Sequence, residues 1–172
     1  MPTSLPIRAA TPADLPDLHA LIERAYRGET ARRGWTHEAD LLKGQRTDVA
    51  TLAAIIGDPA QQMLLAHDGE RLIGCIQLSD RGGGLAYLGQ LAVEPARQAA
   101  GLGKRLLAAA EATAIGFGAT RIEMTVVSQR PELVAYYSRR GYALTGEARP
   151  FPFDQPPRAD PLCLEVMTKS FE

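Results

Sequence analysis

The stretch Arg97-Gln-Ala-Ala-Gly-Leu-Gly-Lys-Arg-Leu-Leu107 places two glycines, Gly101 and Gly103, where a turn leads into an apolar helical pattern. The first N–H groups of a helix have no partners within it, and the helix dipole adds roughly half a positive charge there. A phosphate can bind at such a terminus without a wall of basic side chains. The glycines let the backbone approach closely because neither has a Cβ, and Lys104 adds a positive charge.

Other glycine-rich phosphate loops fit this stretch less well. A Walker A loop requires Ser or Thr after Gly-Lys, whereas Arg105 follows here. A dinucleotide-binding loop requires a third glycine where this chain has Leu106. For the motif taken alone, a glycine turn that only connects a strand to a helix is an equally good interpretation.

Apolar periodicity on both sides of the turn predicts a mixed α/β sheet. Strand-like segments at residues 63–67, 72–78 and 85–93 precede it, and Asp68-Gly69 is a typical hairpin turn between the first two. We expect these three strands to be antiparallel neighbours. The helix after Gly101 leads to a strand at residues 122–126, and such a strand–helix–strand unit favours parallel pairing.

The rest of the chain extends this α/β pattern. Its expected elements are a strand at residues 7–9, helices at 15–26, 49–56 and 131–140, a loop over 143–160 and a strand at 162–166. Asp14 is the expected cap of the first helix. At 172 residues, with no linker-like stretch, residues 1–172 are expected to form a single domain.

Two motifs at the correct separation add a family resemblance. Leu91-Ala-Val-Glu-Pro95, followed by Gln98-Ala-Ala-Gly-Leu-Gly103, is similar to a Leu-x-Val-x-Pro strand end and a Gln/Arg-x-x-Gly-x-Gly/Ala turn. Downstream, Tyr136-Tyr-Ser-Arg-Arg-Gly-Tyr142 resembles an aromatic-Tyr-x-x-x-Gly-aromatic segment. These are motifs of the GNAT superfamily of acetyl-CoA-dependent N-acetyltransferases, which the chain resembles over essentially its whole length.

The resemblance implies a fold and a reaction. The fold is α/β, an acyl-CoA N-acyltransferase fold whose central, mostly antiparallel sheet has a splayed strand pair and is flanked by helices. Residues 1–172 would be a single N-acetyltransferase domain. Acetyl-CoA would lie in the splayed slot as co-substrate, without a metal. A primary amine of a small molecule would attack it directly in a ternary complex.

The resemblance also implies roles for particular residues. The backbone of Leu91, Ala92 and Val93 would pair with the pantetheine arm. The diphosphate would bind backbone N–H groups of Gln98, Ala99, Ala100, Gly101, Leu102, Gly103 and Lys104. The N–H of Val93 would stabilise the oxyanion, and Tyr137 would protonate the leaving thiolate. For Tyr136, a role as a core aromatic is the favoured interpretation.

Three positions depart from the family's pattern. Ala99 replaces a frequent glycine, and Arg130 replaces an Asn that often contacts the cofactor. Tyr87 stands where some relatives have a Glu as general base. Glu123 is expected to face the wrong side of its strand, so we assign no base, and a water chain to solvent would suffice.

Two segments are expected to cover the acceptor, at residues 28–48 and 143–160. The substrate-binding candidates are Trp35, Glu38 and Tyr87, since an aromatic surface and a carboxylate would suit a cationic amine. Alternatively, Glu38 only begins a helix, where acidic residues favour the dipole. Phe151 and Phe153 form either a hydrophobic lid or ordinary loop packing.

Composition limits the other classes. Lys plus Arg number 19 and Asp plus Glu number 20, so no field favours nucleic acid or an anionic membrane. The two cysteines lack metal-ligand spacing and are expected to be buried, reduced thiols. Without an apolar leader or a span of about 20 residues, the chain is expected to be cytoplasmic.

Two alternative functions stay open from the sequence. The chain could be a non-catalytic acyl-CoA-binding sensor, because a base is missing. It could also be a protein or peptide N-acetyltransferase. Either a monomer or a homodimer is compatible with the sequence.

Overall fold

The computed structural model describes residues 6–26, 48–95, 101–128, 130–151 and 161–171. The elements follow in the order β1 (Ile7–Ala9), the 3-10 helix η1 (Pro12–Asp14), α1 (Leu15–Tyr26), α3 (Val49–Gly57), β2 (Gln61–Asp68), β3 (Arg71–Asp80), β4 (Leu85–Val93), α4 (Leu102–Gly116), β5 (Arg121–Val127), α5 (Pro131–Ser138), β6 (Ala143–Pro150) and β7 (Cys163–Ser170).

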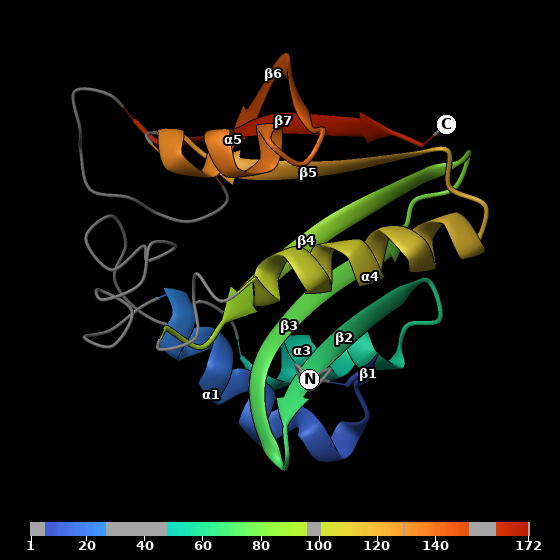
Figure 1. The fold of residues 1–172 in the computed structure, drawn as a ribbon, viewed down its shortest axis with the longest axis vertical. Coiled ribbons are helices and arrows are strands. Elements are labelled where there is room, and N and C mark those ends of the chain that lie inside the picture. Colours follow the sequence, from blue (N-terminus) through green and yellow to red (C-terminus); the bar gives the residue numbers. More distant parts are fainter. Residues whose placement is uncertain (1–5, 27–47, 96–100, 129, 152–160, 172) are drawn as a thin grey trace.

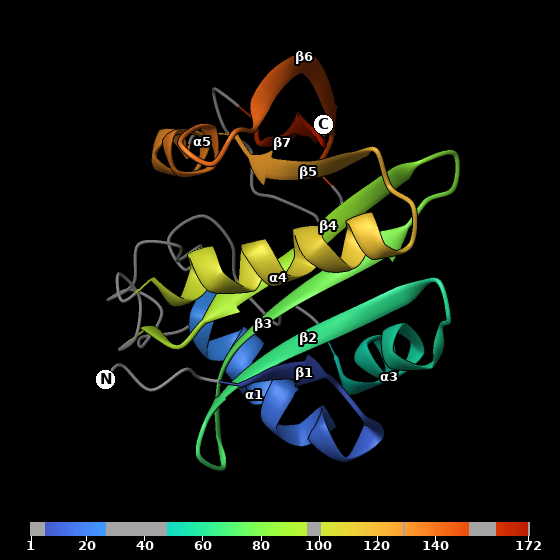
Figure 2. The same cartoon turned by 45° about the vertical axis from the view of Figure 1, so that its right-hand side comes forward.

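The strands form a seven-stranded sheet in the order β1-β2-β3-β4-β5-β7-β6 (Figures 1 and 2). β4 and β5 are parallel, and every other neighbouring pair is antiparallel. The predicted meander of antiparallel strands and the predicted parallel crossover through α4 are therefore confirmed. The sheet is mixed and mostly antiparallel, as expected.

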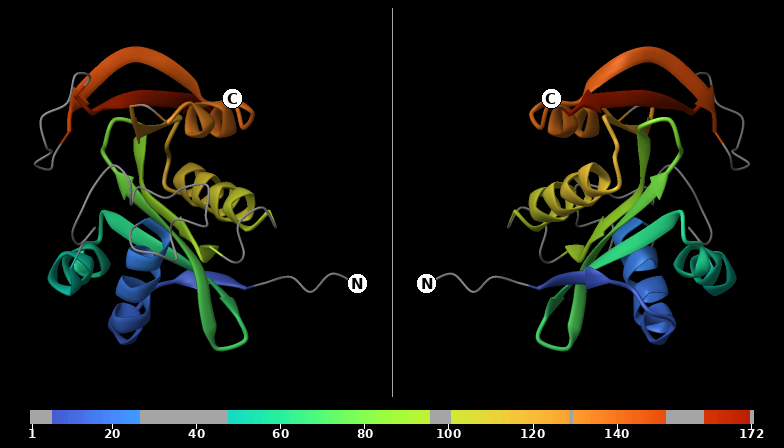
Figure 3. Two further views of the ribbon diagram at one scale, coloured as in Figure 1. Left: turned by 90° about the vertical axis from the view of Figure 1, so that its left-hand side faces the viewer. Right: turned by 90° about the vertical axis from the view of Figure 1, so that its right-hand side faces the viewer.

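Helices cover both faces of the sheet. Helices α4 and α5 lie on one face, and α1 and α3 lie on the other (Figure 3). Two core clusters correspond to these layers. The larger contains Leu106 of α4 and Met124 of β5, and the other contains Leu18 of α1 and Leu52 of α3.

Local sequence explains how the helices at residues 12–26 and 49–57 begin. Asp48 caps α3, since its carboxylate accepts a hydrogen bond of 2.7 Å from Thr51 N. The predicted cap at Asp14 is wrong in position: Thr11 is the N-cap, and the Asp14 carboxylate accepts a bond of 2.8 Å from Thr11 N. The first turn is a 3-10 turn starting at Pro12, so the whole cap lies earlier than the apolar period indicates.

The expectation of a loop over residues 143–160 is wrong for its first part. Residues Ala143–Pro150 form β6, which pairs with β7 at the edge of the sheet. Nearly all side chains of β6 are exposed, and a register shift lies between Leu144 and Ala148. An exposed, irregular edge strand lacks the alternating apolar pattern that identifies a half-buried strand, so backbone pairing with β7 defines it.

The parallel pair β4–β5 is splayed. Its ladder joins Leu85–Leu88 to Arg121–Met124 only, although β4 continues to Val93 and β5 to Val127. On its other side, β4 pairs with β3 through a bulge: Leu78 faces Leu88, whereas Ile76 faces Leu91. β4 therefore has one more residue than β3 over this interval, and the strand turns away from β5. The implied splayed pair is confirmed.

Removing side-chain volume beneath α4 should destabilise the fold. Leu106 is fully buried, with 0% exposure. We expect Leu106→Ala to lower the free energy of unfolding by about 2–5 kcal/mol, because it leaves a cavity. Urea denaturation would measure the loss. Ile115→Ala on the same helix is the control, since Ile115 is 54% exposed and should lose little. Equal losses in the two variants would contradict this packing.

The cysteines differ in exposure, which corrects one expectation. Cys75 is buried as predicted, but Cys163 is partly exposed at the start of β7. Burial raises the pKa of the Cys75 thiol to about 12, so the reactive thiolate is scarce at neutral pH.

We expect the folded protein to react with iodoacetamide near pH 8 at Cys163 and not at Cys75. Peptide mass spectrometry would show the site, and rapid alkylation of Cys75 would contradict its burial.

Candidate functional site

The diverging ends of β4 and β5, with the start of α4, form a fork in the sheet. Leu91 and Val93 pack into the core beneath α4, while the intervening Ala92 belongs to the cluster around α1. These predicted coenzyme-binding residues therefore lie on the strand that leaves β5, as the resemblance implied. Their contacts with the coenzyme stay a prediction.

The structure at the start of α4 explains why glycine stands at both positions 101 and 103. Gly101 is the N-cap, with φ of 82°, a left-handed conformation that favours glycine. A Cβ on Gly103 would lie 2.9 Å from the Tyr136 hydroxyl, so a side chain there would collide with α5. Leu102 is buried and Lys104 is exposed. The predicted N–H donors Gln98, Ala99 and Ala100 lie outside the described residues.

Three tyrosines, two on α5 and one shortly after it, pack edge to face. The Tyr137 ring centroid lies 5.0 Å from that of Tyr136 and 5.9 Å from that of Tyr142. Tyr137 is 5% exposed and belongs to the core cluster beneath α4. Its role as proton donor stays a prediction. The Tyr142 hydroxyl donates to Glu111 Oε2 at 3.0 Å, and burial raises the pKa of Tyr142.

Tyr136 packs against the core beneath α4, as favoured from the sequence, and it also contacts α4 itself. It is partly buried, its hydroxyl reaches the first turn of α4, and burial raises its pKa. The Arg140 guanidinium lies 3.6 Å from the centre of the Tyr136 ring, a cation–π contact. Tyr136 therefore joins α5 to the start of α4 across the fork.

A buried carboxylate holds the end of β4, and the sequence did not indicate it. Glu94 is 5% exposed and follows Val93 directly. Arg24 of α1 donates to Glu94 Oε2 from Nε at 3.1 Å and from Nη2 at 2.8 Å. Arg71 of β3 lies 3.9 Å from Oε1. Glu94 occupies a variable position of the motif, so only these contacts identify it.

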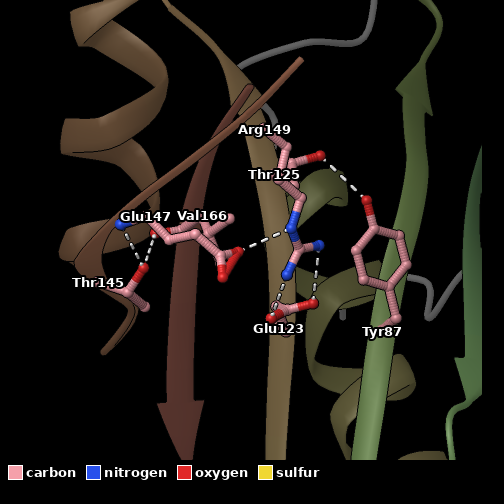
Figure 4. A network of polar contacts seen from close by, with 7 residues as sticks. All are labelled: Tyr87, Glu123, Thr125, Thr145, Glu147, Arg149 and Val166. Carbon is pink, nitrogen blue, oxygen red and sulfur yellow. Dashed lines mark hydrogen bonds and ion pairs between the residues drawn. The ribbon is translucent and has the colours of Figure 1, made fainter. Parts of the chain in front are cut away.

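Tyr87 contributes to a polar network on the face opposite α4 (Figure 4). Its hydroxyl lies 3.0 Å from Thr125 Oγ1, which joins β4 to β5 where their ladder ends. The Arg81 guanidinium lies 4.6 Å from the centre of the Tyr87 ring. Of the predicted substrate-binding residues, Tyr87 is thus at the fork. Trp35 and Glu38 lie outside the described residues, as does Phe153.

The expectation that Glu123 faces away is wrong. In the parallel ladder Glu123 pairs with Tyr87, and its neighbours Ile122 and Met124 belong to the core beneath α4. Side chains alternate along a strand, so Glu123 faces the same side as Tyr87. Both of its oxygens accept from Arg149, at 3.0 and 3.1 Å (Figure 4).

Arg149 reaches this network from β6. Its Nε also donates to the exposed Glu147 at 2.7 Å. The hydrogen bonds to Glu123 raise the pKa of the Arg149 guanidinium further above its ordinary value. The Glu123 carboxylate is therefore already paired with a permanent positive charge.

Arg130, where the family often has Asn, is buried and forms an ion pair with Glu132. It lines a cleft of about 660 Å³ between α5 and β7, together with Val134, Cys163 and Glu165.

Within the described residues, no group of three or more His, Cys, Asp or Glu side chains could hold a metal. No helix in the described part of the chain is long and apolar enough to cross a membrane.

The comparisons with known proteins agree with this geometry. A model described as the acetyltransferase (GNAT) family matches residues 16–142. Among solved structures, the chain is similar to the ribosomal-protein-S18-alanine N-acetyltransferase from Escherichia coli, with TM-score 0.74 and 16% identity over 97% of this chain and 94% of that one. The sequence has no significant match among curated proteins.

Two further structures contain the coenzyme. YncA from Salmonella typhimurium, solved with its cofactor acetyl-CoA, has TM-score 0.73 and 17% identity over 99% of this chain and 95% of that one. PaiA N-acetyltransferase from Thermoplasma acidophilum, in complex with coenzyme A, has TM-score 0.70 and 19% identity over 98% and 100%. Their fold is shared by this chain.

This chain belongs to the GNAT family of acetyltransferases, because the family model covers most of its length. The resemblance stated from the two motifs is confirmed, as are the fold and the enzyme class, an acyltransferase. The single-domain organisation, the cytoplasmic location and the choice between monomer and homodimer stay predictions.

The Glu94 ion pair should stabilise the fold measurably. Glu94→Gln keeps the side-chain shape but removes the charge that accepts from Arg24. We expect the free energy of unfolding to fall by about 1.5–3 kcal/mol, the usual contribution of a hydrogen bond to a charged group. The matched control is Glu147→Gln, whose side chain is 53% exposed and should lose less than about 1 kcal/mol. Similar small losses in urea denaturation would show that Glu94 is not held as described.

Proposed function

We propose that this enzyme transfers an acetyl group from acetyl-CoA to a primary amine of a small molecule. The observation that carries the proposal is the fork, where β4 leaves β5 beside a helix start opened by Gly101 and Gly103. A strand edge and a helix N-terminus together suit an extended chain that ends in a diphosphate.

The residues present fit the coenzyme. Backbone groups of Leu91, Ala92 and Val93 would pair with the pantetheine arm. The diphosphate would accept hydrogen bonds from the backbone N–H groups of Gln98, Ala99, Ala100, Gly101, Leu102, Gly103 and Lys104. When bound, acetyl-CoA supplies the reactive thioester. The Glu94 ion pair supports this assignment because it holds the backbone directly before the turn.

Two groups would act on the reacting atoms. The N–H of Val93 would donate to the carbonyl oxygen as it gains negative charge, and such a donor is worth about 2.7–4 kcal/mol in other acyl-transfer enzymes. Tyr137 would give its proton to the departing sulfur. A phenol suits this task because its reference pKa of about 10 keeps it protonated at neutral pH.

Bonds and protons balance in this transfer. The amine nitrogen bonds to the acyl carbon, and the carbon–sulfur bond breaks. Sulfur receives the Tyr137 proton, and nitrogen loses one proton to water. The Tyr137 phenolate then takes a proton from solvent. Tyr87 is the described residue that would contact the acceptor, and Trp35 and Glu38 are proposed to hold another part of it.

Deleting one hydroxyl should separate chemistry from binding. We expect Tyr137→Phe to lower kcat by about 10²–10⁴-fold, as for loss of a general acid, while the Kd of coenzyme A from calorimetry changes little. Tyr142→Phe is the matched control, since the Tyr142 hydroxyl bonds to Glu111 instead. An unchanged kcat in Tyr137→Phe would remove Tyr137 from the acid role.

The same assay distinguishes the other functions. Released thiol would be measured with wild-type enzyme, acetyl-CoA and a panel of free amines and peptides. Turnover of peptides alone would assign a protein or peptide acceptor. Tight coenzyme binding without any turnover would indicate an acyl-CoA sensor. Absence of coenzyme binding would overturn the proposal.

A further inference from the structure

Among the described residues, one buried polar atom near the fork lacks a hydrogen-bond partner. The side-chain oxygen Oε1 of Gln90, in the bulge of β4, is buried and accepts no hydrogen bond within the described part of the chain. Buried polar atoms are almost always hydrogen-bonded, because an unpaired one loses its contacts with water. A ligand that carries an N–H group would satisfy such an atom.

The bulge determines where Gln90 points. Leu88 and Leu91 both belong to the core beneath α4. Gly89 and Gln90 lie between them, opposite the single residue Gln77 of β3. Each is adjacent to a residue that faces α4, so alternation directs both to the other face. That is the face of Tyr87 and Thr125.

The amide of Gln77, which also lies on this face, is already engaged. Gln77 Nε2 donates to Gln61 Oε1 at 2.7 Å. A Cβ on Gly89 would lie 2.5 Å from Gln77 Oε1, so this amide packs directly against the bulge. Gln77 thus fills the space above Gly89, and its amide N–H bonds to Gln61, so it leaves Gln90 Oε1 without a donor among the described residues.

Three further polar side chains described on this face, Tyr87, Thr125 and Glu123, are also paired. The hydroxyls of Tyr87 and Thr125 bond to each other. Both oxygens of Glu123 accept from Arg149. Among the described residues of this face, the buried acceptor without a donor is therefore an uncharged amide oxygen. Such an oxygen can accept an N–H but cannot take up a proton.

We propose that Gln90 Oε1 accepts an N–H of the acceptor amine and orients its lone pair towards the acyl carbon. This inference rests on the proposed acetyl transfer and specifies its acceptor as a weakly basic primary amine. An amide oxygen offers no charge to hold an ammonium, so the reacting nitrogen must be uncharged. The reference pKa is about 8 for an α-amino group and about 10.4 for a lysine amine, so a far larger share of the α-amine is uncharged at neutral pH.

Gln90→Met tests the contact, since Met has a similar length but no amide. With L-phenylalaninamide as acceptor, we expect KM to rise by about tenfold, the effect of one hydrogen bond at a buried group. The Kd of coenzyme A, measured by calorimetry without an amine, should change less than about twofold on the same scale. The matched control is Gln62→Met, an exposed position on β2, and it should change neither value.

A melting curve would confirm that Gln90→Met folds, and Gln90→Glu would replace it if it did not. Phenethylamine is the matched probe for that variant, because it is L-phenylalaninamide without the carboxamide and is more basic. Gln90→Glu keeps an oxygen acceptor and adds a negative charge that attracts an ammonium. It should therefore lower the KM for phenethylamine relative to that for L-phenylalaninamide.

The amine class is tested with the wild-type enzyme. At pH 7, kcat/KM should be higher for L-phenylalaninamide than for the more basic phenethylamine, and the difference should shrink as the pH rises. A preference for phenethylamine, or acetylation of neither probe, would overturn this class.

The outcomes for Gln90 are equally distinct. An unchanged KM in Gln90→Met, or an unshifted preference in Gln90→Glu, would overturn the contact. A higher Kd for coenzyme A in Gln90→Met would overturn the contact too, because Gln90 would then bind the coenzyme and not the amine. If wild-type enzyme bound no coenzyme, the proposed function itself would fail. If the wild-type enzyme turned over the amine and substitution of Gln90 left KM unchanged, only this inference would be contradicted, and the proposed function would stand.

Discussion

The bulge at Gly89–Gln90 gives β4 one more residue than the facing part of β3. The ladder between β3 and β4 continues before and after the bulge. An extra residue increases the local twist, so β4 follows β3 and leaves β5 after Leu88. The rest of the site depends on this separation. It opens the sheet, places Leu91 and Val93 along the opening and turns the Gln90 side chain to the face opposite α4.

An open fork in a sheet needs support, because its edges have lost the neighbouring strand. Tyr87 and Thr125 join the two strands where their ladder ends. The buried Glu94 ties the far end of β4 to α1 through Arg24. Tyr136 connects α5 to the start of α4 across the opening. These contacts come from distant parts of the chain, so the slot is held by the whole fold and not by the glycine motif alone.

The two sides of the fork have different chemistry. Towards α4 and α5 lie the apolar core and the three packed tyrosines. Towards the other face lies a network of hydroxyls, amides and an arginine–carboxylate pair. Since the Glu123 carboxylate there is already paired with Arg149, this face suits a polar, uncharged group better than a bare cation. Such a division fits a reaction in which an acyl donor and an amine approach from different sides.

Local patterns in the sequence determined most of the elements, because alternation, helical period and turn residues act within a few positions. The strand meander, the crossover through α4 and the glycine turn that leads into α4 could be predicted in this way. Four features could not be predicted: the edge strand β6, the direction of Glu123, the burial of Glu94 and the Gln90 oxygen, which lacks a partner among the described residues. Each depends on a partner far away in the chain: β7, Tyr87 with Arg149, Arg24 and β3 respectively. Only the tertiary structure brings those partners together, since register and packing decide which polar groups meet.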